Sequence, residues 1–374
     1  MAELLQHQYT SVFSDPASKE KKSPKFANPT RNPLEDLSFT EEDIEKAISE
    51  IDTYSSCPDG DIPAIVLKNC KSELSHPIWK MWYDSMETGI IPPEFKYQHI
   101  TPVHKKGSKA KPENYRPISL TSHLIKIFER VLRKKIVAYL EDNEIICRNQ
   151  HGFRKGRSCL TQLLNHVDLI LKNLLNNNDT DAIYLDYAKA FDKVYHLILL
   201  EKIHAYGIRG KIHSWLTSYL SDRIQTVVIN GKKSNPAPVI SGVPQGTVLG
   251  PILFLLYIND LNTCVKHSFL SSFADDTRIM KEIRNVSDVN FLQADLDASV
   301  QWSNNNNMKL HTSKFEYLCH ATNSSKSLKE LPFSSQYYQY TTSDGSHITP
   351  TPMVRDLGIN IVQDLTCSPH ILTL

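Results

Sequence analysis

Three aspartates lie beside apolar segments that alternate as strands do. Asp275 and Asp276 are adjacent in LSSFADDTRIMK (residues 270–281), which reads as a half-buried hairpin. Asp186 ends the apolar segment DAIYLD, and a helical pattern follows it. Paired aspartates at a hairpin tip also suit an ordinary solvated turn, because Asp is a common turn residue. The pair alone therefore leaves both interpretations open.

A strand over residues 181–187 lying beside this hairpin would bring Asp186, Asp275 and Asp276 to one edge of a sheet. Three carboxylates in one place need cations, since concentrated like charge is unfavourable. Mg²⁺ fits, as a hard cation that binds carboxylates together with substrate phosphates. Two such ions about 3.5–4 Å apart would hold the attacking and leaving oxygens of a phosphoryl transfer. That is polymerase chemistry.

A glycine-rich segment, SGVPQGTVLGPILFLLYINDL (residues 241–261), lies between the two acidic motifs. Its small residues would let a ligand approach the backbone closely, and Gln245 could then hydrogen-bond that ligand. The alternative is a loop that only starts a buried helix.

Composition favours a globular protein with a sizeable core, at 374 residues and 40% hydrophobic content. The net charge is +1, but residues 96–135 carry +9 and the other 334 residues carry −8, which favours a polyanion-binding surface over a merely solvated face. The seven cysteines form no C-x-x-C pair, so we expect reduced thiols and an intracellular protein. No secretory signal opens the chain, and the longest apolar run, residues 248–258, is too short to span a membrane.

The elements that would position the acids follow from periodicity. Thr40 and Asp43 form a capping box before an apolar stripe, and Asn230-Gly231 predicts a hairpin turn. The pattern predicts helices over residues 40–51, 65–67, 78–86, 123–141, 158–175, 196–206, 212–220, 248–263 and 288–303, and strands over 97–120 (around a basic loop), 181–187, 308–319 and 353–362. We therefore expect an α+β fold with an antiparallel sheet backed by helices.

Seven motifs in order complete the argument: KPENYRPISL, NQHGFRKGRS, YLDYAKAFDKV, SGVPQGTVLGPILFLLYINDL, SFADDTRI, MKLHTSKFEYL and VRDLGI. Each motif alone is weakly specific, but their order and spacing from about Thr40 to Leu365 strongly resemble the reverse transcriptases of non-LTR (LINE-type) retrotransposons. The resemblance implies a right-hand polymerase with a palm, helical and β fingers, and a thumb that is largely absent here.

The resemblance implies roles for single residues. Asp186 and Asp275 would bind two Mg²⁺ ions (Mn²⁺ is a possible substitute), with Asp276 assisting and the carbonyl of Tyr187 as a further ligand. Lys314 would protonate the departing pyrophosphate, and the alternative is an exposed strand lysine.

Other residues would bind nucleotide or nucleic acid. The implied nucleotide-binding residues are Lys105 or Lys106, Arg116, Phe191, Gln245 and Gly246, where Phe191 would exclude a 2′-hydroxyl or else be a core aromatic. The implied nucleic-acid-binding residues are Phe153, Arg154, Lys155 and Arg157, with an affinity that falls as salt rises.

Some positions depart from the usual family pattern. The hairpin reads FADD where YADD is commoner, and Tyr195 replaces a frequent Asn. His311 and Phe315 stand where Asn and Thr are usual, which bears on the assignment of Lys314. None of these changes removes an expected metal ligand.

The expected organisation is a flexible segment over residues 1–39, fingers with an N-terminal extension over 40–180, and a palm over 181–374. The reverse transcriptase domain would cover about 85–365, without an endonuclease before it. The leading hypothesis is an RNA-directed DNA polymerase that takes an RNA template, a DNA primer and dNTPs, with nuclear or cytoplasmic action and no membrane partner. The alternative is a nucleic-acid-binding remnant of such an element that turns over little or nothing.

Overall fold

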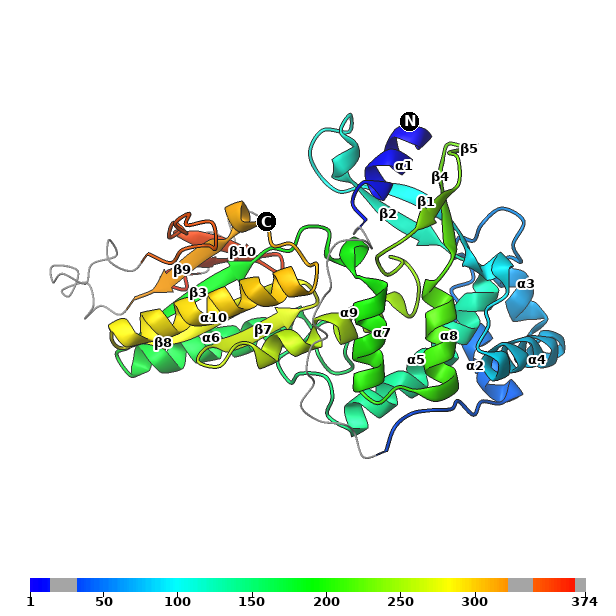
Figure 1. The fold of residues 1–374 in the computed structure, drawn as a ribbon, viewed down its shortest axis with the longest axis horizontal. Helices are drawn as coiled ribbons and strands as arrows, with labels where there is room; N and C mark the ends of the chain where they lie inside the picture. Colours follow the sequence, from blue (N-terminus) through cyan, green and yellow to red (C-terminus); the bar gives the residue numbers. More distant parts are fainter. Residues whose placement is uncertain (14–31, 322–338, 367–374) are drawn as a thin grey trace. The chain divides into compact units, whose positions relative to one another are not determined.

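The computed structural model describes residues 1–13, 32–321 and 339–366, and it has an α+β fold (Figure 1). The chain forms two compact units, each made from two chain segments. Unit 1 comprises Met1–Ile146 and Phe191–Tyr257, and unit 2 comprises Cys147–Ala190 and Ile258–Leu374. The α+β class is confirmed. Within the described ranges, no helix is long and apolar enough to cross a membrane.

Unit 1 contains a mixed sheet with the strand order β2-β1-β4-β5, and β6 also pairs with β4. Its strands are β1 (Tyr97–His104), β2 (Tyr115–Leu120), β4 (Arg223–Ile229), β5 (Lys232–Lys233) and β6 (Ala237–Val239). β1 pairs antiparallel with β2 and parallel with β4. The predicted turn at Asn230-Gly231 is confirmed, because both residues have positive φ and Ile229 pairs with Lys232.

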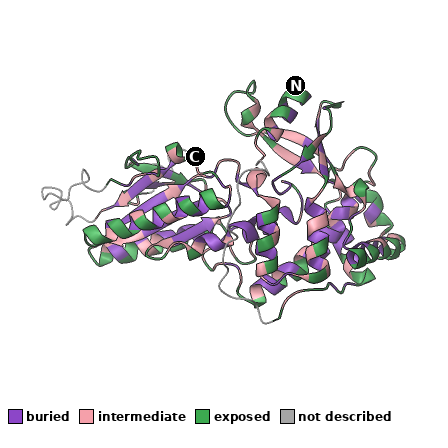
Figure 2. Ribbon diagram, in the orientation of Figure 1, coloured by how far each residue is buried: buried purple, intermediate pink, exposed green. Residues whose placement is uncertain are grey.

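Helices bury an aromatic core in unit 1. The helices of this part of the chain are α2 (Glu41–Ser49), α3 (Ala64–Asn69), α4 (Lys71–Thr88), α5 (His123–Asp142), α7 (His196–Ala205), α8 (Gly210–Leu220) and α9 (Gly250–Ile258), with the short 3-10 helices η1 (Pro93–Lys96), η2 (Pro112–Asn114) and η3 (Ala190–Lys193). Trp82 of α4 stacks on Phe128 of α5 with ring centroids 5.0 Å apart, and Trp215 of α8 packs edge-on against Phe128. Figure 2 shows the buried positions along these helices.

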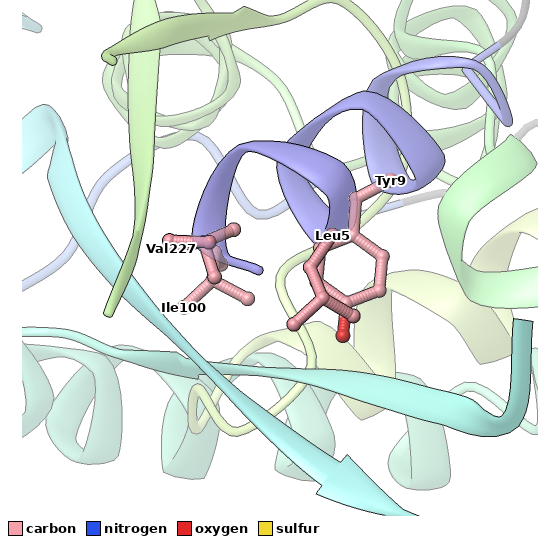
Figure 3. Packing of buried hydrophobic residues seen from close by; sticks show 5 residues of the cluster. Leu5, Tyr9, Ile100 and Val227 are labelled. Atoms are coloured by element: carbon pink, nitrogen blue, oxygen red, sulfur yellow. The ribbon is translucent and has the colours of Figure 1, made fainter. Parts of the chain in front are cut away.

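The first helix, α1 (Ala2–Thr10), corrects a prediction. Leu5 and Tyr9 are buried against Ile100 of β1 and Val227 of β4 (Figure 3). The prediction that residues 1–39 are flexible follows from the Pro- and Lys-rich composition from residue 14 onward, which obscures the short i, i+4 apolar stripe before it. Residues 14–31 of that range lie outside the described residues. Each fully buried apolar side chain of this size contributes about 1.5–3 kcal/mol.

Unit 2 is built on an antiparallel sheet with the strand order β7-β8-β3-β9, as predicted for the sheet that carries the three aspartates. Its elements are α6 (Cys159–Leu175), β3 (Asp179–Leu185), η4 (Asn259–Thr263), β7 (Phe269–Phe273), β8 (Asp276–Ile283), α10 (Val286–Asn305), η5 (Thr312–Lys314), β9 (Glu316–His320), β10 (Met353–Asp356) and β11 (Ile359–Val362). Helix α6 packs Ile170 against Ala182 of β3 and Met280 of β8. Helix α10 packs on β8.

Two predicted boundaries differ from the structure. The helix predicted over residues 248–263 ends at Ile258 and continues as η4, where the Asn259 side chain accepts a hydrogen bond from the Cys147 amide. The strand predicted over residues 308–319 is interrupted by η5. In both cases the element ends at a turn, and the periodicity of apolar residues gives no signal for such a turn. By contrast, the capping box at Thr40 and Asp43 is present.

Asp181 is a buried carboxylate in the middle of unit 2. The hydroxyl of Tyr340 donates a 2.7 Å hydrogen bond to its Oδ2. Burial raises the pKa of Asp181 to about 6, although hydrogen bonds from Tyr340, Cys319 and Tyr317 oppose the rise. In the unfolded chain this carboxyl has an ordinary pKa near ~4.

We predict that the free energy of unfolding contributed by Asp181 falls as pH rises. Below about pH 4 the group is protonated in both states, and between about pH 4 and 6 the folded state binds more protons, so stability is lost through that window. Urea unfolding of the wild type and of Asp181→Asn should show the variant gaining roughly 3 kcal/mol relative to the wild type between pH 4 and pH 7. A Tyr340→Phe variant, which lacks the opposing donor, should move the wild-type loss to higher pH. An equal pH slope for wild type and Asp181→Asn would contradict the prediction.

Candidate active site

The register of unit 2 brings the three aspartates to one end of its sheet. β3 pairs with β8 so that Leu185 lies opposite Thr277, and the next residue along β3 is Asp186. The β7–β8 hairpin closes with Phe273 opposite Asp276, which leaves Ala274 and Asp275 as its two-residue turn. Asp186 therefore follows β3 level with the hairpin tip. Asp186 and Asp275 are half-buried and Asp276 is exposed.

A further segment continues this pairing beyond β3. The amide of His311 donates to the carbonyl of Asp186 at 2.8 Å, and the amide of Ala188 donates to the carbonyl of Lys309 at 3.1 Å. The turn η5 follows directly, and it places Nζ of Lys314 3.0 Å from Oδ2 of Asp186. Lys314 thus lies in a turn and contacts a candidate catalytic carboxylate. Since the two side chains are 58% and 42% exposed, the pair contributes at most about 1 kcal/mol to stability.

The negative charges of the aspartates raise the pKa of neighbouring groups. Burial raises the pKa of Glu316, and the negative charge of Asp186 raises it further. Burial likewise raises the pKa of the Tyr187 phenol, and the charge of Asp275 adds to the rise. Glu316 pairs with Tyr184 of β3, and sequence reasoning did not single it out. Its position two residues after Lys314, in a strand, is the signal that could have found it.

The two candidate residues of the glycine-rich loop, Gln245 and Gly246, lie in unit 1. Nε2 of Gln245 donates to Oδ1 of Asp192 at 2.8 Å, and the carbonyl of Gln245 accepts from the amide of Ser119 in β2 at 2.6 Å. Gly246 has φ +104°, and a Cβ there would lie 2.8 Å from the Ser119 carbonyl, so this position requires glycine. The Gln245 side chain is therefore oriented by Asp192 of η3.

Phe191 is half-buried in unit 1. Its ring stacks on Phe254 of α9, with centroids 4.2 Å apart and planes 16° apart. The carbonyl of Phe191 also accepts from the amide of Val243 at 2.9 Å. The stacking on Phe254 of α9 is the contact expected of a core aromatic, and the side chain is nevertheless only partly buried.

The basic candidates of unit 1 lie on and between the first two strands. Arg116 is exposed in β2, opposite Val103 of β1. Lys105 and Lys106 are exposed in the connection between these strands. All three belong to unit 1, whereas the aspartates and Lys314 belong to unit 2.

The loop predicted to grip nucleic acid lies in unit 2. Phe153 and Lys155 are exposed, and Arg157 is half-exposed. Nη1 of Arg154 donates to the carbonyl of Cys147 at 2.8 Å, so this guanidinium also organises the loop itself. Exposed Phe153 and Lys155 match the aromatic and cationic pairing that single-stranded nucleic acids favour.

The donor chemistry suits a hard divalent cation. Within the described ranges no group of three His, Cys, Asp or Glu side chains is arranged to hold a metal ion by itself. Mg²⁺, however, is usually bound by one or two carboxylates together with substrate phosphates and waters. Asp186, Asp275 and the carbonyl of Tyr187 supply oxygen donors of this kind, and the ammonium of Lys314 shows that Asp186 attracts a cation.

Comparison with known proteins identifies the family of the chain. Residues 103–360 match the reverse transcriptase (RNA-dependent DNA polymerase) family, whose members generally use divalent metal ions. The chain is 30% identical over 238 residues to the RNA-directed DNA polymerase from mobile element jockey of Drosophila melanogaster, which covers 61% of this chain and 26% of the relative.

Two further relatives come from the same species. The probable RNA-directed DNA polymerase from transposon X-element is 32% identical over 235 residues, or 61% of this chain and 26% of the relative. The corresponding protein from transposon BS is 29% identical over 292 residues, or 75% of this chain and 31% of the relative. The chain thus spans about a quarter to a third of the length of these relatives. On these matches, the chain belongs to the reverse transcriptase family, among the reverse transcriptases of non-LTR retrotransposons.

Proposed function

We propose that this chain is an RNA-directed DNA polymerase that adds dNTPs to the 3′-hydroxyl of a primer paired with an RNA template. The observation that carries the proposal is the end of the unit 2 sheet, where Asp186 and the Asp275–Asp276 hairpin lie level and Lys314 contacts Asp186. The family match supports the reaction class, which a cluster of acids alone would not.

The residues at this end of the sheet would bind the metal ions and supply a proton. Asp186 and Asp275, with the carbonyl of Tyr187, would hold two Mg²⁺ ions, and Asp276 would raise the negative potential beside them. When bound, these ions supply the positive charge that favours attack by the primer hydroxyl and departure of pyrophosphate. Lys314 would give a proton to the departing pyrophosphate.

The remaining residues would bind the substrates. Arg116 with Lys105 or Lys106 would neutralise the triphosphate, and Gln245 and Gly246 would contact the incoming nucleotide and template. Phe191 would reject ribonucleotides by excluding the 2′-hydroxyl. Phe153, Arg154, Lys155 and Arg157 would hold the template backbone, with binding that weakens as salt rises.

The first prediction from the proposed function concerns Asp275. Wild-type protein should extend oligo(dT) on poly(rA) with dTTP and Mg²⁺. Asp275→Asn keeps the shape of the side chain and removes its charge, so the extension rate should fall about a thousandfold, which corresponds to roughly 4 kcal/mol of lost transition-state stabilisation. Asp168→Asn is the matched control, since Asp168 is an exposed aspartate of unit 2 that pairs with Lys172 on α6.

Absence of extension by folded wild-type protein would end the polymerase proposal. Retained binding of the poly(rA)·oligo(dT) duplex in that case would support the alternative, a nucleic-acid-binding remnant.

The second prediction separates two roles for Lys314. Lys314→Arg keeps the positive charge beside Asp186, but a guanidinium does not release its proton at neutral pH. If Lys314 is the general acid, single-nucleotide incorporation by Lys314→Arg should slow by about 10²–10⁴-fold in rapid-quench measurements. Incorporation at the wild-type rate would show instead that Lys314 acts only as a counter-charge, and Lys314→Gln would then be the slower variant of the two.

The third prediction concerns sugar selection by Phe191. Phe191→Ala removes the ring and should increase incorporation of rTTP relative to dTTP by at least about tenfold, which corresponds to roughly 1.4 kcal/mol. Phe254→Ala, which removes its stacking partner on α9, is the control for loss of packing. Equal ribonucleotide incorporation by both variants would assign Phe191 to the core alone.

A further inference from the structure

The hairpin that carries Asp275 has an unusual turn residue. Ala274, the residue directly before Asp275, has φ +56°, a conformation that residues other than glycine and asparagine adopt rarely. It is also buried. Because a strained backbone persists only where its surroundings hold it, something must fix Ala274 in place.

A single side chain from a distant part of the sequence does so. Oε1 of Gln150 accepts from the amide of Ala274 at 2.9 Å, and Nε2 of Gln150 lies 3.4 Å from the Ala274 carbonyl oxygen. Oε1 also accepts from the amide of Gly152 at 2.8 Å, and the two amide donors together fix the orientation of the Gln150 side chain. Gln150 is 6% exposed, so water does not compete for these bonds.

The backbone around Gln150 is itself attached to the hairpin. The amide of His151 donates to the carbonyl of Ser272 at 2.8 Å, and the amide of Ser272 donates to the carbonyl of Asn149 at 3.1 Å. A Cβ at Gly152 would lie 2.5 Å from the amide nitrogen of Ala274, so only glycine allows this approach. Residues 149–152 therefore lie along the end of β7 and contact its turn.

We propose that Gln150 is a positioning residue for the polymerase reaction. It contacts no reacting atom. It fixes both backbone polar groups of Ala274, and thereby the direction in which the next residue, Asp275, presents its carboxylate. The inference rests on the proposed function of Asp275 as a metal ligand. Supporting hydrogen bonds of this kind matter because a catalytic group must be held to within about 0.5 Å of its productive position.

A merely structural role would give a different result, and three variants separate the two. Gln150→Ala removes all the hydrogen bonds, and Gln150→Glu retains an acceptor for the amides of Ala274 and Gly152. Gln162→Ala is the matched control, because Gln162 is also a buried amide of unit 2, and its Nε2 donates to Oγ of Ser271 in β7 at 3.1 Å, away from the turn.

The measurements are the affinity for Mn²⁺ alone, followed by the electron paramagnetic resonance signal of the free ion, and the Mg²⁺ concentration that half-saturates primer extension. Gln150→Ala should lower the affinity for Mn²⁺ and raise the half-saturating Mg²⁺ concentration, each by about 10–100-fold, as expected for loss of a group that orients a metal ligand. Gln150→Glu keeps the acceptor but loses the donor and adds negative charge, so it should alter both metal measurements less than Gln150→Ala does. Gln162→Ala should lower the thermal midpoint without changing either metal measurement. Hydrogen exchange over residues 270–277 should be faster in Gln150→Ala than in Gln162→Ala.

The outcomes are distinct. If the wild type extends primers, and Gln150→Ala and Gln162→Ala lose stability alike with unchanged metal dependence, Gln150 is structural and the inference is wrong while the proposed function stands. If the wild type neither binds Mn²⁺ nor extends primers, the proposed function fails, and the inference fails with it.

Discussion

The antiparallel register between β3 and β8 is the constraint on which the candidate site depends. Because Leu185 lies opposite Thr277, Asp186 leaves β3 level with the β7–β8 turn. A slip of one residue would turn every side chain of β3 to the other face and separate the acids. Like charges at the ends of neighbouring strands destabilise a sheet, so the apolar pairs within it, such as Ile183 opposite Ile279, have to hold the register. The apolar pairing of the sheet therefore stabilises a register in which these carboxylates lie close together despite their repulsion.

Much of this site could be predicted from the sequence because its signals are local. Alternating apolar residues marked β3 and the hairpin, and the motif order supplied the family. The pairing of Lys314 with Asp186 could not be derived in this way, since it depends on η5, a turn of three residues inside what reads as a strand. Gln150 was missed for a related reason: a polar residue in a loop shows no periodicity, and its partner lies 124 residues away.

The fold shows the same division between local and distant information. The capping box at Thr40 and the turn at Asn230-Gly231 each depend on a few neighbouring residues, and both are present as predicted. Helix α1 was missed because its nine residues are stable only through burial of Leu5 and Tyr9 against a sheet formed by strands far along the chain. Isolated helices this short are marginal in water, so the i, i+4 pair of Leu5 and Tyr9 could not by itself have established the helix.

A neutral amide at position 150 suits the hairpin turn because several carboxylates already lie near it. Asp186, Asp275, Asp276 and Glu316 all lie at or near this end of the sheet, and the charge of Asp186 already raises the pKa of Glu316. Another carboxylate at position 150 would add repulsion, and a lysine or arginine there would compete with divalent ions for Asp275. Glutamine offers an acceptor for the Ala274 amide and a donor toward its carbonyl without adding charge. A neutral side chain can therefore fix the backbone of Ala274 without adding to the negative charge of these carboxylates, of which Asp186 already pairs with Lys314.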